Sequence, residues 1–327
     1  MKRFLMMAAL FAAPLFFASC NHPVIVPDDE GGDDKPAEAI VLTRAEEGIN
    51  AGANAFGLNV FRTINASDKT DDLFISPLSL SLALAMTSAG ADGRTEAQMR
   101  SMLGFGEVTN AEMAAYFRKM TEALLSLDPR TTLQIANAIW TDKGITLKKG
   151  FVSDVTKYYH SEANSADMSA TATIDAINRW CSDHTNGKIP KILDYDSRGL
   201  AVLLVNALYF NGTWTTQFSD TFEGRFRALS GAGVSTPMMR TTRDLRYSAD
   251  KQWQMVQLPY GNGGFVMDLL LPVDEKGTEA AAVTAIGMKA TSVGPSQTVY
   301  FIADRPFVFA IREVSTGAIL FIGQKTK

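Results

Sequence analysis

The sequence predicts an α+β fold with a helical N-terminal half and large mixed β-sheets. Two observations support this prediction. Apolar residues recur at helical spacing in the first half, as in 111–127, whereas the last third holds short apolar runs separated by turn residues. With 327 residues and 46% hydrophobic content, the chain can bury a sizeable core. We expect one folded domain over residues 43–327.

The N-terminus has the features of an export signal. Met1-Lys2-Arg3 is basic, residues 4–17 are apolar, and Ala18-Ser19 supplies small residues before Cys20. Because the apolar stretch is too short to cross a bilayer in the mature protein, residues 1–19 are predicted to be a cleaved signal peptide. The Ala-Ser-Cys ending resembles a bacterial lipobox, which implies a lipoprotein with lipid attached at Cys20. An ordinary secretory signal with an incidental cysteine is the alternative.

This lipobox resemblance also implies a location. We expect an extracellular or extracytoplasmic protein of the bacterial cell envelope, anchored by lipid to the outer membrane or cell surface, with no other membrane contact. Residues 20–42 are polar, acidic and rich in proline and glycine, which is typical of a disordered tether. The one other cysteine, Cys181, falls on the apolar side of an expected helix and is predicted to be a buried, inert thiol.

Start and stop signals define the elements of the first half. Ser76 can cap a helix whose first turn holds Pro77, and Gly90 ends it. Residues 111–127 form a second helix, and the apolar residues of 174–184 mark a third. Between them, 133–140 alternates in polarity as a strand does.

Apolar runs define the strands of the second half. Residues 200–210 form a nearly continuous apolar run, which indicates a strand covered on both faces. Asn206 then becomes a buried polar side chain that needs partners. Further strands are expected at 265–271, 299–302, 307–313 and 318–322, with turns at Tyr260-Gly261-Asn262-Gly263-Gly264 and at Ser315-Thr316-Gly317.

Several classes of function lack support. The sequence has no G-x-S-x-G, H-E-x-x-H, C-x-x-C or phosphate-loop motif, so we expect neither an enzyme nor a metal or cofactor site. Its three histidines, His22, His160 and His184, stand apart in the sequence. A formal net charge of −4 without a basic cluster argues against nucleic-acid binding.

A tract of charged and small residues, 274–284, precedes the last strands. It suits a loop that bends at Gly277 and later slides into a tight slot as a strand. In a strand, Thr278, Ala280, Ala282 and Thr284 would share one face, and all are small. A flexible alanine-rich linker is the plainer interpretation.

Together these segments resemble the serpin family of serine protease inhibitors in residue type and in order. The resemblance covers most of the folded region. The matching motifs are Asn59-Val60-Phe61, Phe74-Ile75-Ser76-Pro77-Leu78-Ser79, Ala89-Gly90-Ala91-Asp92-Gly93-Arg94-Thr95, Asn178-Arg179-Trp180 with Thr185-Asn186-Gly187-Lys188-Ile189, Leu204–Trp214, the 274–284 tract, and Arg305-Pro306-Phe307-Val308-Phe309.

The resemblance implies a serine-type endopeptidase inhibitor that is used once. A protease acylates an exposed reactive-centre loop, here about 275–298, and the cut loop inserts into the main sheet as a new strand, distorting the trapped enzyme. The hinge would comprise Glu275, Gly277, Thr278, Glu279, Ala280, Ala281, Ala282, Val283 and Thr284. Ser76, Ser79 and Asn206 match positions beneath the main sheet where it opens, and Trp214 matches a position at its top, as does Glu275.

The family's hinge spacing places the scissile bond at Thr291–Ser292. A small residue there suits an elastase-like or subtilisin-like serine protease. A shifted register would use Lys289–Ala290 and suit a trypsin-like enzyme, and cysteine proteases are a further class. We expect a monomer without cofactor.

One departure from the family pattern concerns the segment before the hinge. Leu270-Leu271-Pro272 is followed at once by Val273-Asp274-Glu275, where serpins have a long segment with two strands of the main sheet. An inserted strand would therefore pair on one side only and remain an edge. The resemblance leaves three possibilities: a truncated serpin that folds and binds but no longer traps a protease, a degenerate product, or an incomplete sequence. The alternative to an inhibitor is a non-inhibitory binding protein that is cleaved as a substrate.

Overall fold

The computed structural model describes residues 35–67, 71–195, 198–273, 286–289 and 298–327. These residues fall into two compact units. The helix-rich unit comprises Ile40–Gly57 and Ser76–Gly212, and the strand-rich unit comprises Leu58–Ile75 and Thr213–Lys327 together with residues 35–39. Helix α2 (Arg44–Ser67) contributes residues to both units.

Most helices belong to the helix-rich unit, and two of them begin at clear caps. At α3, the Ser76 hydroxyl accepts a hydrogen bond from the Ser79 amide at 3.1 Å, and Gly90 caps the end as the sequence predicts. At α5, Thr109 and Glu112 form a capping box. The helices are α3 (Pro77–Ala89), α4 (Gly93–Met102), α5 (Asn110–Ser126), α6 (Lys149–Tyr159) and α7 (Thr171–His184).

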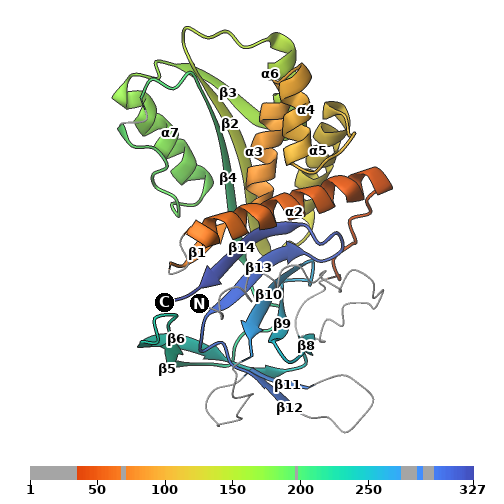
Figure 1. Ribbon diagram of the computed structural model, residues 1–327, viewed down its shortest axis with the longest axis vertical. Helices are drawn as coiled ribbons and strands as arrows, with labels where there is room; N and C mark the ends of the chain where they lie inside the picture. Colours follow the sequence, from red (N-terminus) through yellow and green to blue (C-terminus); the bar gives the residue numbers. More distant parts are fainter. Residues whose placement is uncertain (1–34, 68–70, 196–197, 274–285, 290–297) are drawn as a thin grey trace. The chain divides into compact units, whose positions relative to one another are not determined.

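The sheet of the helix-rich unit has three strands in the order β3-β2-β4. Strand β2 (Thr131–Asp142) pairs in parallel with β3 (Ser161–Ala166) and antiparallel with β4 (Val202–Gly212). Helices α3 and α7 both contact β4 and lie on opposite sides of it in Figure 1. The expectation that the strand at 200–210 is covered on both faces is therefore confirmed, and Val205, Ala207 and Leu208 are buried.

The six-stranded sheet of the strand-rich unit has the strand order β1-β14-β13-β10-β9-β8, and all its strands pair antiparallel. Its strands are β1 (Leu73–Ile75), β8 (Tyr247–Ala249), β9 (Trp253–Tyr260), β10 (Phe265–Pro272), β13 (Phe307–Glu313) and β14 (Ile319–Lys325). The strands expected at 265–271, 307–313 and 318–322 are thus confirmed within a few residues.

Both predicted turns join neighbouring strands of this sheet. Between β9 and β10, Gly261 and Gly263 have φ of 46° and 86°, which glycine adopts without steric cost. Between β13 and β14, the Glu313 carboxylate accepts the amides of Ser315 and Thr316 at 2.6 and 2.7 Å. These bonds fix the hairpin and align the C-terminal strand.

Two smaller sheets complete the strand-rich unit. Strands β5 (Asp220–Arg227) and β6 (Gly233–Arg240) form an antiparallel hairpin. Strand β11 (Ile286–Lys289) pairs antiparallel with β12 (Thr298–Phe301) and parallel with β7 (Thr242–Arg243).

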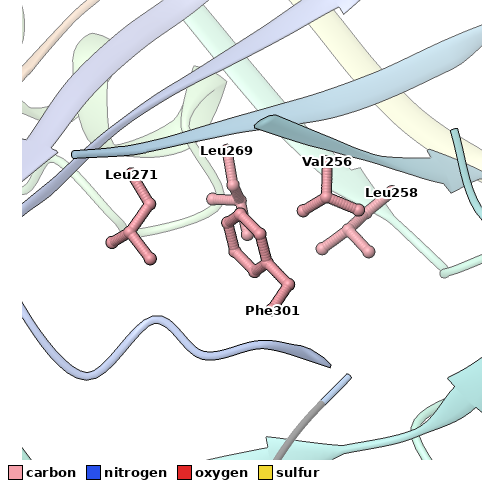
Figure 2. Packing of buried hydrophobic residues seen from close by; sticks show 5 residues of the cluster. All are labelled: Val256, Leu258, Leu269, Leu271 and Phe301. Atoms are coloured by element: carbon pink, nitrogen blue, oxygen red, sulfur yellow. The ribbon is translucent and has the colours of Figure 1, made fainter. Parts of the chain in front are cut away.

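Apolar side chains of β9 and β10 form a core cluster with a residue from another segment. Val256 and Leu258 come from β9, Leu269 and Leu271 come from β10, and Phe301 from β12 points toward them (Figure 2). All five are at most 8% exposed. This cluster holds the 301–309 segment against the six-stranded sheet.

Candidate functional site

The free edge of β4 is the feature that the serpin resemblance makes most relevant. Strand β4 pairs with β2 over eleven positions, from Val202 opposite Thr141 to Gly212 opposite Thr131. Within the described ranges, no strand pairs with its other side. That edge carries backbone donors and acceptors that another strand can satisfy.

A pair of asparagines lies at the middle of this sheet. Asn206 of β4 stands opposite Asn137 of β2 and donates its side-chain amide to the Asn137 carbonyl oxygen at 2.6 Å. Asn137 is 2% exposed and donates in turn to the Tyr159 backbone carbonyl at 2.7 Å. Asn206 is half-buried rather than buried as expected, and its side-chain amide has the expected polar partner.

The side-chain oxygen of Asn206, unlike its amide, is unsatisfied. This Oδ1 atom is buried and has no hydrogen-bond partner among the described residues. A buried acceptor in this state costs about 1–3 kcal/mol. Asn206 therefore presents an unmet acceptor on the strand that forms the edge of the sheet.

Ser76 and Ser79, the other two residues expected beneath the sheet, meet at the start of α3. Ser76 caps the helix through the Ser79 amide, as described above, and Pro77 holds the first turn. Helix α3 then packs against β4. The structure therefore places these two serines and Asn206 on adjoining elements of the helix-rich unit.

Trp214 lies in the strand-rich unit. Its backbone forms a bridge with Tyr260, and its ring stacks on the Tyr260 ring at a centroid distance of 4.2 Å and an interplanar angle of 13°. Burial raises the pKa of the Tyr260 phenol. Hydrogen bonds from Thr215 N to Pro259 O (2.9 Å) and from Gly261 N to Thr213 O (2.8 Å) flank Trp214.

The expected reactive-centre loop lies largely outside the described residues. All nine predicted hinge residues, the bond Thr291–Ser292, and Ala290 fall there, as does the predicted lipidation site Cys20. The exception is Ile286–Lys289, which forms β11 rather than a loop. Lys289, the alternative scissile residue, pairs with Thr298 of β12.

Other expected site features are located as follows. Cys181 is 2% exposed, and burial raises the pKa of its thiol, in line with the expected inert role. His184 lies against Trp180, with ring centroids 4.2 Å apart.

In the part of the chain described, no three His, Cys, Asp or Glu side chains gather as metal ligands would. Among the described helices, none combines the length and apolar character needed to cross a bilayer.

Asn137 and the aromatic residues around Trp214 were missed by reasoning from the sequence. Asn137 lies in an alternating strand, where its pairing with a residue 69 positions away depends on the register between strands. Phe218, which meets the Trp214 ring edge-on at 5.7 Å and 80°, comes from the linker after β4. No local pattern marks either contact.

Comparison with known proteins identifies the family. A family model described as serpin (serine protease inhibitor) matches residues 51–274 and 273–327. The two matches meet at residues 273–274, directly before the tract that the sequence analysis expects to be the hinge.

Individual relatives agree with this match. The chain is 32% identical to corticosteroid-binding globulin of Saimiri sciureus over 77% of this chain and 63% of that protein. It is 31% identical to leukocyte elastase inhibitor of Xenopus laevis over 69% of this chain and 62% of that protein. The chain therefore spans slightly less than two thirds of the length of these curated relatives.

A solved structure supports the fold. The native stressed conformation of Arabidopsis AtSerpin1 superposes with a TM-score of 0.74 at 22% identity, covering 88% of this chain and 99% of that chain. The serpin-like α+β fold expected from the sequence is thus confirmed. From its family model, its relatives and its fold, the chain belongs to the serpin family.

Proposed function

We propose that this chain inhibits a serine protease by offering residues 275–298 as bait. The protease attacks the carbonyl carbon of Thr291 and becomes acylated to it, while the chain from Ser292 onward leaves. The freed strand that ends at Thr291 then adds to β4 and carries the protease with it, which distorts the protease active site. Serpins are in general inhibitors or binding proteins rather than catalysts.

The single observation that carries this proposal is the free edge of β4. Strand addition there satisfies the backbone groups that β4 turns away from β2, which alternate along the strand, without first separating two strands. Each cross-strand pair contributes about 0.2–1 kcal/mol, so a strand of eight residues gains several kcal/mol. The small hinge residues Thr278, Ala280, Ala282 and Thr284 can enter a covered layer with little overpacking.

A second candidate function is a non-inhibitory binding protein that proteases merely cleave. One observation favours it: in the described chain β4 has no neighbour beyond it, so the added strand would itself be an edge and would gain fewer contacts than a central strand. One relative at 32% identity is a corticosteroid-binding globulin, so the family includes binders as well as inhibitors.

The partner class follows from the bait residues. Thr291 after Ala290 suits an elastase-like or subtilisin-like protease, and Lys289 suits a trypsin-like enzyme in a shifted register. The purified protein without residues 1–20 is to be mixed with one protease of each type and run on a denaturing gel. Inhibition gives a covalent band at the summed mass, and mass spectrometry of the released peptide identifies the bond. Cleaved protein beside fully active protease supports the binding protein instead.

We also propose that the protein is exported and lipid-anchored at Cys20 in a bacterial envelope. The support is the basic, apolar and small-residue order of residues 1–20. Metabolic labelling with a radioactive fatty acid tests it. The protein is expected to incorporate the label and partition into detergent, and Cys20→Ala is expected to abolish both. A Cys181→Ala variant, which removes the buried thiol, is expected to retain the label.

A further inference from the structure

A pocket of about 390 Å³ opens in the strand-rich unit. It is lined by side chains of β5, β6, β9, β10 and β13 together with the 301–303 segment. Its volume falls at the lower end of the roughly 300–1,000 Å³ range of small-molecule sites. None of the residues assigned above to bait, hinge or sheet opening lines it except Trp214.

Aromatic rings dominate the walls. Trp214 and Phe218 meet edge-on at 5.7 Å, and Phe226 and Phe307 meet edge-on at 6.5 Å. Phe309 adjoins Phe307 at 6.2 Å. Edge-to-face and offset contacts of this kind are those that aromatic rings prefer, so the walls can take a further flat ring.

Three methionines add an adaptable surface. Met238, Met239 and Met267 line the pocket, and Met239 is 52% exposed. Unbranched, polarisable side chains fit themselves to ligands of differing outline. The pocket therefore selects for apolar character and flatness more than for one exact shape.

Two cations at or beside the pocket are already paired with carboxylates. Lys325 lines it, with Nζ 5.9 Å from the Phe226 ring centroid and 2.7 Å from an Asp72 carboxylate oxygen. Arg240 lies over Phe222 and is paired with Asp220. An anionic ligand would lose its hydration here without gaining a free counter-charge from either of these two cations.

Arg243 is a further cation beside the pocket. Its guanidinium lies 5.2 Å from the centroid of Phe218 and donates to the backbone carbonyl oxygen of Thr216. A backbone carbonyl does not neutralise the charge, so an anionic ligand is the occupant that a test must distinguish from a neutral one.

We propose that this pocket binds a neutral, flat molecule of two or three rings. The walls supply ring contacts, the methionines adapt, and Lys325 and Arg240 are already paired with Asp72 and Asp220, so neither offers a free charge to an anion. This binding goes beyond protease inhibition and does not depend on it.

The test uses the purified protein with [¹³C-methyl]methionine and titrates 2-acetonaphthalene, a neutral two-ring probe, by NMR. Signals are assigned by Met→Leu substitutions. The methyl signals of Met238, Met239 and Met267 are expected to shift along one saturable curve with a sub-millimolar dissociation constant. Met113 and Met120, buried in the helix-rich unit, are expected to stay unchanged.

Two comparisons test whether the probe binds in this pocket and whether the pocket prefers a neutral ligand. Ala303→Phe fills the pocket and is expected to weaken binding at least tenfold, whereas Ala115→Phe, on the exposed face of α5, leaves it unchanged. Thr236→Phe, at a second lining position, serves if Ala303→Phe impairs folding. The anion 2-naphthoate is expected to bind at least tenfold more weakly than the ketone. The proposal is overturned by absent or non-saturable pocket shifts, by unchanged affinity in the filled variant, or by equal or tighter binding of naphthoate.

Discussion

At the scale of single residues, Asp72 secures the end of the last strand in the strand-rich unit. Its carboxylate accepts the Lys325 ammonium at 2.7 Å and the amides of Thr326 and Lys327 at 2.7 and 3.2 Å. Partial burial would raise the pKa of Asp72, but these hydrogen bonds outweigh burial and lower the pKa to about 2. The ionised form therefore stabilises the fold.

The Asp72→Asn variant is expected to lose this contribution at neutral pH. Because the folded pKa lies below the unfolded one, the stabilisation is complete above about pH 4 and disappears as pH falls through about 2. Urea unfolding of wild type and variant from pH 2 to 7 checks this, and the two curves of free energy against pH are expected to converge at the acid end. Asp71→Asn is the control, since its pair with Lys327 is about 60% exposed on both sides. An equal loss in both variants would contradict the assignment.

The asparagine pair gives a second prediction at this scale. Asn137→Ala is expected to lower the free energy of unfolding by about 1–3 kcal/mol, because it strips the Tyr159 carbonyl and the Asn206 amide of their buried partner. Asn211→Ala, at an exposed position on the neighbouring strand β4, is expected to change it by less than about 0.5 kcal/mol. Denaturant titration at neutral pH measures both, and equal effects would sink the argument for a buried relay.

At the scale of elements, helices α2 and α3 approach closely at one glycine. A Cβ at Gly57 would meet the Pro77 Cβ at 2.3 Å, closer than any real contact. On the same helix, a Cβ at Gly48 would meet nothing within 4 Å. These two positions separate the effect of packing from the effect of helix propensity.

Gly57→Ala is accordingly expected to destabilise the protein by about 1–3 kcal/mol through overpacking. Gly48→Ala is expected to stabilise it by about 0.5–1 kcal/mol, because alanine is the better helix former at an interior position. Thermal unfolding of the two variants beside wild type measures both. A stabilised Gly57→Ala variant would show that the helices part readily.

Elements with local signals were predictable, and those shaped by pairing were not. The Ser76-Pro77 start of α3 and the 315–317 hairpin carry their caps and turns in adjacent residues. Strand β6 contains Gly233 and Pro237, and α4 buries none of its side chains, so neither shows a pattern of its own. Their structure comes from β5 and from the neighbouring helices, which a single stretch of sequence does not reveal.

At the scale of the whole molecule, the same distinction applies to the candidate site. Ser76, Ser79, Asn206 and Trp214 were found through family motifs, and the structure describes all four. The pocket beside Trp214 was not found, because its walls come from segments spread over more than 100 residues. The bait and hinge lie outside the described residues and stay predictions.

Cleavage provides the prediction for the whole molecule. If the cut loop adds to β4, a gain of several kcal/mol is expected to raise the unfolding temperature by about 10 °C. Calorimetry before and after cleavage by a subtilisin-like protease measures the rise. Ala282→Arg is expected to be cleaved equally well but to show no rise and no covalent complex, because a charge cannot enter the covered layer. A rise of the same size in this variant would rule out strand addition as its cause.

The labelling rate of the buried Cys181 thiol reports how often the helix that carries it opens. The thiol lies on the buried side of α7, so a small alkylating reagent reaches it only when that helix opens. Its raised pKa keeps it in the less reactive protonated form. With Cys20 replaced, Cys181 carries the one thiol in the chain. At high reagent concentration the labelling rate equals the rate at which α7 opens, measured without denaturant.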